Sequence, residues 1–249
     1  MLDFKNKNIL IAGSGGIGRE LVKTLNDEGA NLYLIDINSD LLSELKNAFP
    51  AIRQTLSCDF NNVREIEQTV SGLNPEAGGF DGFVYSAGIT GSRPLNLTNY
   101  DSALKVMNIN FFAFVEMVRC VIKKRLYNPA FSIVGLSSVG AFLGNASQTA
   151  YCASKAAMNG AVRAMAIELA KKAVRINTIA PGTTDTPMFR EAEKDLISNS
   201  EAFKKRLERQ YLGLCAPKDI VNSILFFLSD MSRMITGSCL TVDGGKLTS

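Results

Sequence analysis

A tyrosine, a lysine and a serine in this chain have types and spacings suited to moving a proton. Tyr151 and Lys155 are four residues apart, so on a helix both side chains would lie on one face. A free tyrosine titrates near pH ~10, and a nearby ammonium lowers that pKa by favouring the phenolate. Ser138 lies thirteen residues before Tyr151, and a serine hydroxyl is a group that can hydrogen-bond a substrate oxygen as charge develops on it. These three side chains predict general acid/base catalysis.

A glycine-rich segment near the N-terminus predicts a dinucleotide site. Gly13, Gly15 and Gly18 satisfy the pattern G-x-G-x-x-G, between an apolar run and an amphipathic one. In this motif the first glycine permits a tight turn, the second lets the backbone approach a pyrophosphate, and the third allows close helix–strand packing. The N-terminus of the following helix faces the phosphates. With Gly16 and Ile17, these residues form the expected phosphate loop.

Asp36 is the expected acidic partner of that loop. It lies 18 residues beyond Gly18, at the end of the second apolar run, close to the spacing of about 20 typical of a carboxylate that binds a ribose 2′-hydroxyl. A carboxylate there would repel a 2′-phosphate, and the glycine loop before Gly18 contains no Arg or Lys. The sequence therefore predicts NAD (NADH) as cofactor, with NADP less favoured. Alternatively, Asp36 caps the next helix in competition with Asn38.

The elements that must position these residues alternate along the chain. Short apolar runs predict seven strands: Asn8–Ala12, Asn31–Asp36, Thr55–Asp59, Asp81–Ser86, Ala130–Leu136, Arg175–Ile179 and Cys239–Val242. Longer amphipathic runs predict helices: Ile17–Glu28, Asn38–Ala48, Val63–Ser71, Tyr100–Lys124 with a break near Asn108–Asn110, Ala150–Lys171, a polar Thr186–Tyr211 and Pro217–Ser229. This alternation predicts an α/β fold. We expect one Rossmann-type doubly wound domain over residues 1–249, with a mostly parallel seven-stranded sheet and helices on both faces.

The order of these motifs resembles the short-chain dehydrogenase/reductase family over nearly the whole chain. Gly13–Gly18 looks like the family's glycine motif, and Tyr151–Lys155 looks like its Tyr-x-x-x-Lys pair. Ser86-Ala87-Gly88 stands where the family has Asn-Ala-Gly after its fourth strand. Further matches, in the family's order, are Asn110, Arg175–Gly182, Thr186–Met188 and Val242–Gly245.

The resemblance implies a mechanism and a set of site residues. A hydride would pass between the nicotinamide and the substrate carbon, and Tyr151 would exchange the proton with the substrate oxygen. Lys155 would also hold the nicotinamide ribose, and Asn110 would support a water that links Lys155 to solvent. The other cofactor-binding residues that the resemblance implies are Asp59 near the adenine amino group, Phe60, Ser86, Ala87, Gly88, Pro181, Gly182, Thr184 near the carboxamide, and Thr186.

Two positions depart from the family's pattern. The glycine loop is one residue shorter than usual, and Ala12 stands where threonine is common. NADP-preferring members often carry a basic residue at the missing position, which again favours NAD. Ser86 replaces the common asparagine, and a hydroxyl offers fewer donors than an amide, so we expect some loss of rigidity there.

Composition excludes several classes of function. The chain has no histidine, which removes Ser-His-Asp and Cys-His hydrolases and histidine-ligated metal sites; no metal site is predicted. The net charge of +3 is too small to indicate nucleic acid or an anionic membrane. The longest apolar stretch, Ile109–Ile122, is too short and too polar to span a bilayer. Five scattered cysteines and the lack of room for a signal peptide favour the cytoplasm.

Two helices predict association between copies. Ala150–Lys171 is rich in Ala, Gly and Ser, so its outer face permits close approach of another helix, although high propensity alone also explains alanines. Asn110–Ile122 is apolar nearly all round, more than a monomer needs. With the habit of the resembled family, this indicates a homo-oligomer, either a dimer or a tetramer.

The substrate is predicted only as a small secondary alcohol or ketone. Its specificity is expected in Thr90–Asn96, Gly140–Gln148 and Thr186–Tyr211. These segments supply the apolar residues Phe142, Leu143, Met188, Phe189 and Leu196, and the cations Arg93 and Arg190. Either arginine would suit a carboxylate or phosphate, but both are also typical of solvated loops. The alternatives are a β-ketoacyl-carrier-protein reductase, which would prefer NADPH, and a dinucleotide-binding regulator without catalysis.

Overall fold

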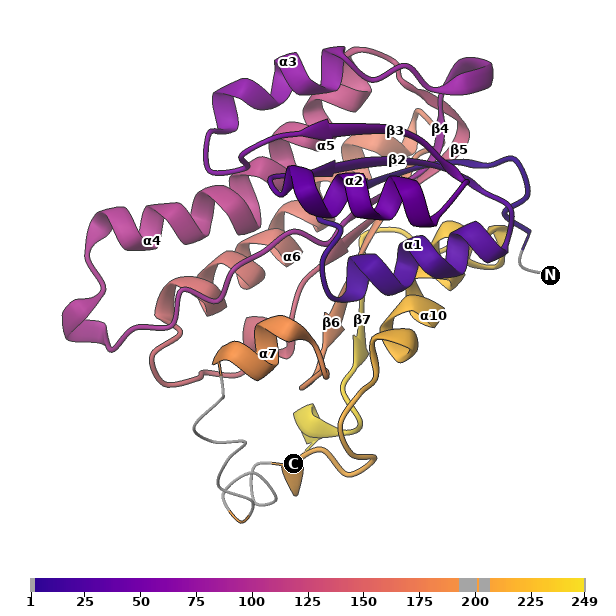
Figure 1. The fold of residues 1–249 in the computed structure, drawn as a ribbon. Helices are drawn as coiled ribbons and strands as arrows, with labels where there is room; N and C mark the ends of the chain where they lie inside the picture. Colours follow the sequence, from indigo (N-terminus) through magenta and orange to yellow (C-terminus); the bar gives the residue numbers. More distant parts are fainter. Residues whose placement is uncertain (1–2, 193–200, 202–206, 249) are drawn as a thin grey trace.

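The computed structural model describes residues 3–192, 201 and 207–248, and its centre is one parallel sheet (Figure 1). The strands are β1 (Asn8–Ala12), β2 (Asn31–Asp36), β3 (Ile52–Ser57), β4 (Phe80–Tyr85), β5 (Tyr127–Leu136), β6 (Arg175–Pro181) and β7 (Cys239–Val242). Their order is β3-β2-β1-β4-β5-β6-β7, and every pairing among them is parallel. The predicted seven-stranded α/β fold is therefore confirmed.

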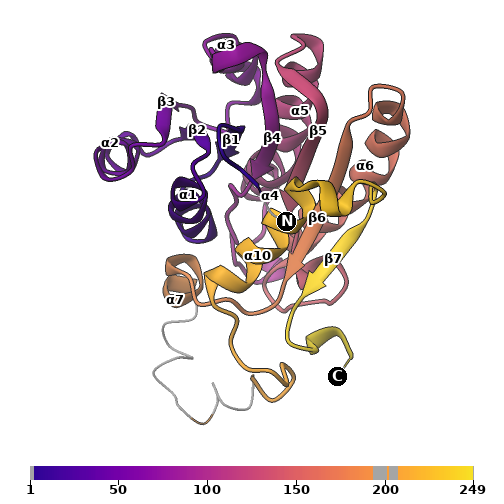
Figure 2. The same ribbon diagram turned by 90° about the vertical axis from the view of Figure 1, so that its right-hand side faces the viewer.

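Helices cover both faces of the sheet (Figure 2). On one face lie α1 (Ile17–Asp27), α2 (Ser39–Ala48) and α10 (Pro217–Leu228); on the other lie α3 (Ile66–Ser71), α5 (Ala113–Lys123) and α6 (Thr149–Ala170). β1 shows why both faces need cover. Its residues are all buried, with Ile9 and Ile11 in one core and Leu10 and Ala12 in the other. Such double burial produces the continuous apolar runs of parallel strands.

The start of α2 and the division of the next long helical segment agree with the residues found there. The Asn38 Oδ1 accepts the N–H of Leu41 at 2.9 Å, so Asn38 is the N-cap of α2. The long helix expected over Tyr100–Lys124 is divided at the predicted break into α4 (Tyr100–Met107), a π-helical turn at Asn108–Phe112, and α5.

The expected helical region Thr186–Tyr211 is described only in part. It begins as α7 (Pro187–Ala192), which lies beyond the carboxyl end of β6. Residues 193–200 and 202–206 of that prediction, including Leu196, lie outside the described residues.

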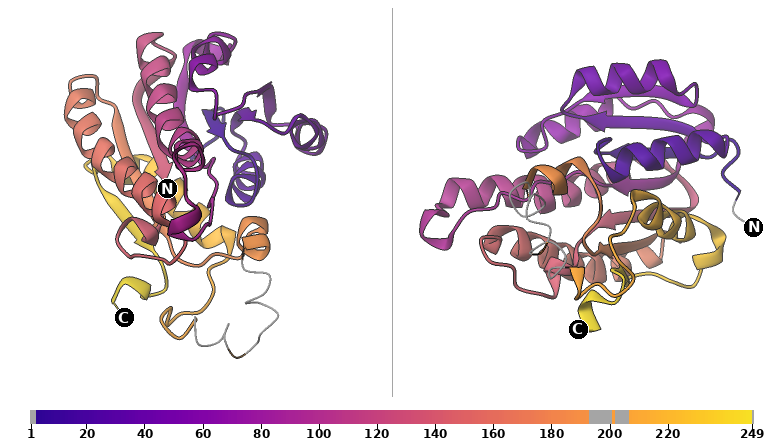
Figure 3. Two further views of the ribbon diagram at one scale, coloured as in Figure 1. Left: turned by 90° about the vertical axis from the view of Figure 1, so that its left-hand side faces the viewer. Right: turned by 60° about the horizontal axis from the view of Figure 1, so that its bottom comes forward.

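The carboxyl ends of the strands gather the segments that carry the predicted site. The strand order reverses at β1, which lies between β2 and β4, and ligands of open α/β sheets bind at such a switch point. The C-terminal turn follows the carboxyl end of β7, well away from the N-terminus (Figure 3). No helix in the described part of the chain is both long enough and apolar enough to span a membrane.

Candidate active site

One cleft of about 480 Å³ lies at the carboxyl ends of the strands, a size typical of ligand sites. Most of the predicted site residues line it, from the glycine loop to the segment after β6. They are Gly13, Gly15, Gly16, Ile17, Asp36, Asp59, Phe60, Ser86, Ala87, Gly88, Ser138, Tyr151, Lys155, Pro181, Gly182, Thr184 and Thr186. Gly18 and Asn110 do not line the cleft.

The glycine loop has the shape that a dinucleotide phosphate needs. Gly13 has φ 93°, and a Cβ there would lie 2.3 Å from the backbone nitrogen of Ala87, so this position needs glycine for both its turn and its packing. A Cβ on Gly18 would lie 2.1 Å from the Gly13 carbonyl oxygen. A Cβ on Gly15 would meet nothing within 4 Å, so its backbone faces open space. The loop at the start of α1 thus fits a pyrophosphate.

Ser86 ties this loop to the end of β4. Its Oγ donates to the Gly13 carbonyl oxygen at 2.5 Å and lies 3.3 Å from that of Ala12. The serine that replaces the family's common asparagine therefore reaches the glycine loop directly.

Asp36 is anchored at the cleft by two backbone amides. Its Oδ2 accepts the N–H of Ser14 at 2.6 Å, and its Oδ1 accepts the N–H of Asn38 at 3.0 Å. Asn38 is the cap of α2, so the alternative in which Asp36 has that role is wrong. Ile37, which lines the cleft beside Asp36 although its side chain is 62% exposed, was not singled out from the sequence.

Tyr151 and Lys155 meet at the start of α6. The Lys155 Nζ lies 5.8 Å from the centroid of the Tyr151 ring and donates to the Leu136 carbonyl oxygen at 2.6 Å. Burial lowers the pKa of the Lys155 ammonium to about 8. Burial also raises the pKa of the Tyr151 phenol above 10.0, and a hydrogen bond with Ser138 offsets this only in part.

The expectation that Lys155 lowers the pKa of Tyr151 is therefore wrong in this structure. Desolvation of the phenol dominates, and the ammonium is directed at Leu136. Tyr151 is consequently protonated at neutral pH, which is the form that gives a proton to a carbonyl oxygen.

The two adjacent serines have different surroundings. Ser137 is buried, with its N–H bonded to the Ile179 carbonyl at 2.7 Å and its Oγ donating to the Lys155 carbonyl at 3.3 Å. The Ser138 Oγ accepts the N–H of Gly140 at 3.0 Å and is the serine bonded to Tyr151. This geometry supports the choice of Ser138 as the serine that contacts substrate.

Asn110 is fully buried on the π-helical turn. Its amide exchanges two hydrogen bonds with the backbone of Ile89, at 2.9 and 3.0 Å, and donates to the Ser154 Oγ at 3.0 Å. A Cβ on Gly88 would lie 3.3 Å from the Asn110 Oδ1 and 3.5 Å from the Lys155 Nζ. Asn110 therefore joins the loop after β4 to α6 directly behind Lys155.

The substrate end of the cleft differs from the sequence-based expectation. Met188 and Phe189 line it, but Phe142 and Leu143 do not. Neither predicted arginine lines it: both are exposed, and Arg190 is paired with Asp185 at 2.7 Å. Thr90, Asn145 and Gln148, which lie in the segments predicted for specificity, do line the cleft. Thr183 and Lys246 also line it and were not predicted; no spacing rule connects these two, because they come from separate loops.

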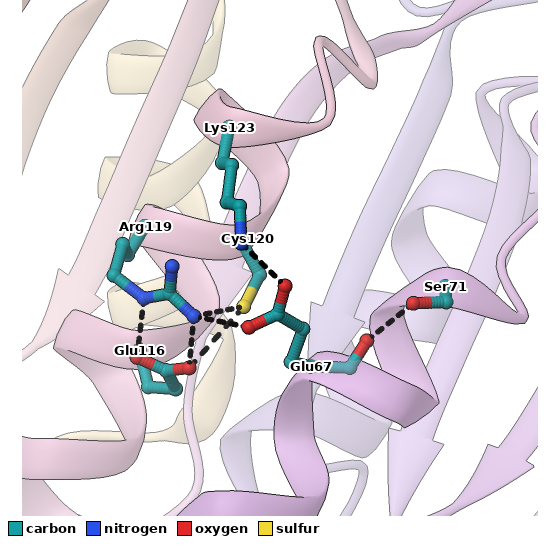
Figure 4. A network of polar contacts seen from close by, with 6 residues as sticks. All are labelled: Glu67, Ser71, Glu116, Arg119, Cys120 and Lys123. Carbon is teal, nitrogen blue, oxygen red and sulfur yellow. Dashed lines mark hydrogen bonds and ion pairs between the residues drawn. The ribbon is translucent and has the colours of Figure 1, made fainter.

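A second polar cluster, away from the cleft, joins α3 to α5 (Figure 4). Arg119 bonds Glu116 and Glu67, each at 2.6 Å, and Lys123 bonds Glu67 at 2.8 Å. These cations lower the pKa of the Glu67 carboxyl to about 2. Glu67, Glu116 and Cys120 have ligand-type atoms close together, but Arg119 and Lys123 bond the two carboxylates, so the cluster is a clamp between helices.

Sequence comparisons match this chain over nearly its full length. A family model described as Enoyl-(Acyl carrier protein) reductase matches residues 11–246. The 3-oxoacyl-[acyl-carrier-protein] reductase FabG of Rickettsia felis is 30% identical over 248 residues and 99% of both chains. The 2-(S)-hydroxypropyl-CoM dehydrogenase 3 of Xanthobacter autotrophicus is 27% identical over 246 residues, covering 97% of this chain and 96% of that protein.

Solved structures show the same architecture. Levodione reductase superposes with a TM-score of 0.89 at 28% identity, covering 99% of both chains. A glucose/ribitol dehydrogenase of the short-chain type from Brucella melitensis has a TM-score of 0.88 at 29% identity, covering 98% of both chains. Both similarities thus extend over nearly the whole chain.

Proposed function

Because the chain belongs to the short-chain dehydrogenase/reductase family, whose members act on CH–OH groups, we propose that it binds NAD(H) and uses Tyr151 as its proton donor and acceptor. The enzyme interconverts a secondary alcohol and a ketone. Membership of this enzyme family leaves no reason to retain the non-catalytic regulator as an alternative. The observation that carries the proposal is the convergence of Tyr151, Lys155 and Ser138 in one cleft with the glycine loop.

The chain's own residues account for every step except hydride transfer, which a bound nicotinamide would supply. Tyr151 gives its proton to the carbonyl oxygen during reduction and takes it back from the alcohol during oxidation. Ser138 holds the same oxygen and stabilises its developing charge. Lys155 would hold the nicotinamide ribose, and Asn110 keeps the loop after β4 in place through its two hydrogen bonds with the Ile89 backbone.

The preference for NADH over NADPH is supported by Asp36. Its carboxylate is held at the cleft edge by the amides of Ser14 and Asn38, where it would accept hydrogen bonds from the ribose diol and repel a 2′-phosphate. We expect NADH to bind at least about tenfold more tightly than NADPH, a difference of roughly 1.4 kcal/mol, in titrations followed by cofactor fluorescence or calorimetry.

Two variants separate the charge of Asp36 from its hydrogen bonds. Asp36→Asn removes the charge but keeps an acceptor oxygen, so NADPH should gain affinity. Asp36→Ala also removes the bond to Ser14, so NADH should lose affinity as well. Asp40→Ala, at an exposed site on α2, is the matched control. Equal affinity of the wild type for both cofactors would refute the assignment.

A second candidate activity is reduction of a 3-oxoacyl group carried on a thioester. It is favoured by the 30% identity over 99% of the chain to a 3-oxoacyl-[acyl-carrier-protein] reductase. Asp36 argues against this activity if it needs NADPH, because the carboxylate would repel the 2′-phosphate of that cofactor. Assays with a 3-oxoacyl thioester and a panel of ketones, each with both cofactors, decide between the two activities.

We further propose that the enzyme is a homo-oligomer associated through the outer face of α6. Ala153 and Ala164 are exposed there, Ala157 and Gly160 are half-buried, and Ile167 is 78% exposed. Burial of such a face against a second helix is favourable. We also propose that the protein is a single domain, lies in the cytoplasm and acts on a small molecule, without a nucleic-acid or membrane partner.

Light scattering should therefore give a mass of at least twice 27.0 kDa at micromolar concentration. Ala164→Glu buries a charge in the proposed interface and should shift the population towards monomer. Ala170→Glu, exposed on the last turn of the same helix, should leave it unchanged. A wild-type protein that stays monomeric at every concentration contradicts the proposal.

A further inference from the structure

The charged side chains that line the cleft are divided between its two ends. Asp36 ends β2 and Asp59 follows β3, on one side of the sheet, whereas Lys155 on α6 and Lys246 after β7 lie on the other. Among the described residues that line the cleft, these four carry the charges. The proposed function assigns a role to Asp36, Asp59 and Lys155, but none to Lys246.

Lys246 lies on a hydrogen-bonded turn at the edge of the cleft. The buried carboxylate of Asp243 accepts the backbone N–H of Gly245 at 3.0 Å and of Leu247 at 2.9 Å. Gly245 has φ 90°, and a Cβ there would lie 2.6 Å from the Tyr211 ring, so the turn packs closely against its neighbour. The backbone position of Lys246 is thereby defined before any ligand binds.

The Lys246 ammonium is directed at the segment that follows β6. Its Nζ donates to the Thr183 Oγ1 at 2.9 Å, and Thr183 is itself a buried residue of the cleft wall. Gln210 fixes Thr183 through its backbone, at 2.8 Å to the N–H and 3.0 Å to the carbonyl. An ammonium that is half-buried in such a wall favours an anionic acceptor, because charge-assisted hydrogen bonds strengthen as water is excluded.

Lys246 reaches the strand next to the one that carries the reacting serine. Thr183 follows β6, and Ser138 follows β5, which is the direct neighbour of β6 in the sheet. The segment after β6 also reaches the glycine loop, because a Cβ on Gly16 would lie 3.5 Å from the Thr186 side chain. The NADH affinity of Lys246 variants therefore distinguishes a substrate anion from a cofactor phosphate as the group that Lys246 holds.

We propose that Lys246 binds an anionic group of the substrate, so that the alcohol or ketone carries a carboxylate or phosphate remote from its reacting carbon. This inference rests on the proposed function, because it places the substrate oxygen at Tyr151 and Ser138. It gives Lys246 the role that sequence reasoning considered for Arg93 and Arg190, neither of which lines the cleft.

Matched pairs of ketones test the inference on the full-length protein with NADH. Acetoacetate and levulinate are each compared with their methyl esters, and dihydroxyacetone phosphate is compared with dihydroxyacetone. Binding is followed by the fluorescence of bound NADH and turnover by its absorbance. The carboxylate and phosphate pairs distinguish the two kinds of anion.

At least one anion should exceed its neutral partner by tenfold or more in affinity or in kcat/KM. Lys246→Met should abolish that ratio and leave the neutral partner unchanged, whereas Lys246→Arg should retain much of it. Lys46→Met, at an exposed site on α2, is the matched control. NADH affinity should stay within about threefold in all three variants.

Three results would overturn the inference. The first is that the neutral ketones equal or exceed every anionic ketone in affinity and kcat/KM, and the second is that the preference for an anion survives Lys246→Met. The third is a tenfold loss of NADH affinity in Lys246→Met, which would mean that Lys246 binds the cofactor. In each case intact NADH binding by the wild type, with loss of turnover in Tyr151→Phe, leaves the proposed function standing. A wild type that binds no NADH refutes the proposed function instead.

Discussion

Tyr151→Phe is expected to lower kcat by about 10²–10⁴-fold, the range typical of the loss of a general acid/base. The variant keeps the ring but lacks the phenol oxygen that exchanges the proton. A Cβ on Gly140 would lie 3.3 Å from the Tyr151 ring, so retention of the ring preserves this packing. The measurements are kcat on the best ketone from a screen and NADH affinity by fluorescence, which should change by less than about threefold.

The control for this variant is Tyr100→Phe. Tyr100 is 76% exposed and lies at the start of α4, outside the cleft lining, so removal of its hydroxyl should leave kcat unchanged. Near-wild-type turnover by Tyr151→Phe would contradict the assignment. Loss of NADH binding together with turnover would instead indicate a collapsed site.

Lys155→Met is expected to change both catalysis and the pH dependence of stability. Loss of the ammonium removes the group that is proposed to hold the nicotinamide ribose, so kcat should fall by roughly a hundredfold or more. The stability effect follows from the pKa of Lys155, which burial lowers from 10.5 to about 8 in the folded protein. Below pH 8 both the folded and the unfolded chain carry the charge, and the fold bears the full desolvation cost.

That cost disappears as the pH rises from about 8 towards 10.5, because Lys155 loses its proton in the folded protein first. The free energy of unfolding of the wild type should therefore rise relative to that of Lys155→Met by roughly 2 kcal/mol between pH 7 and pH 10, at about 1.4 kcal/mol per unit of pKa shift. Urea unfolding of both proteins at several pH values measures the difference.

The part of the difference that varies with pH reports the ionisation of Lys155 in the folded protein. Lys46→Met is the control, because Lys46 is exposed on α2 and lies outside the cleft lining. A constant difference between wild type and Lys155→Met across the range would mean that Lys155 keeps its ordinary pKa in the fold.

The sequence by itself determined the fold and the local motifs of this protein. Parallel strands buried on both faces must be apolar along their whole length, so runs such as Asn31–Asp36 could be recognised without coordinates. The glycine loop could be recognised as well, because its turn and its packing depend on residues within one strand–turn–helix unit. The same holds for the break near Asn108–Asn110, which became the π-helical turn.

Only the tertiary structure decided the direction of the Tyr151 pKa shift and the residues that line the substrate end of the cleft. The pKa of Tyr151 depends chiefly on burial of the phenol in the folded protein, so the spacing to Lys155 suggested the wrong direction. Asp36 and Asn38 are both plausible caps by type, and only the position of Ser14 decided between them. Lys246 reaches the cleft because β7 lies beside β6 and the Asp243 turn packs on Tyr211. Such contacts join residues far apart in the chain, and no local periodicity encodes them.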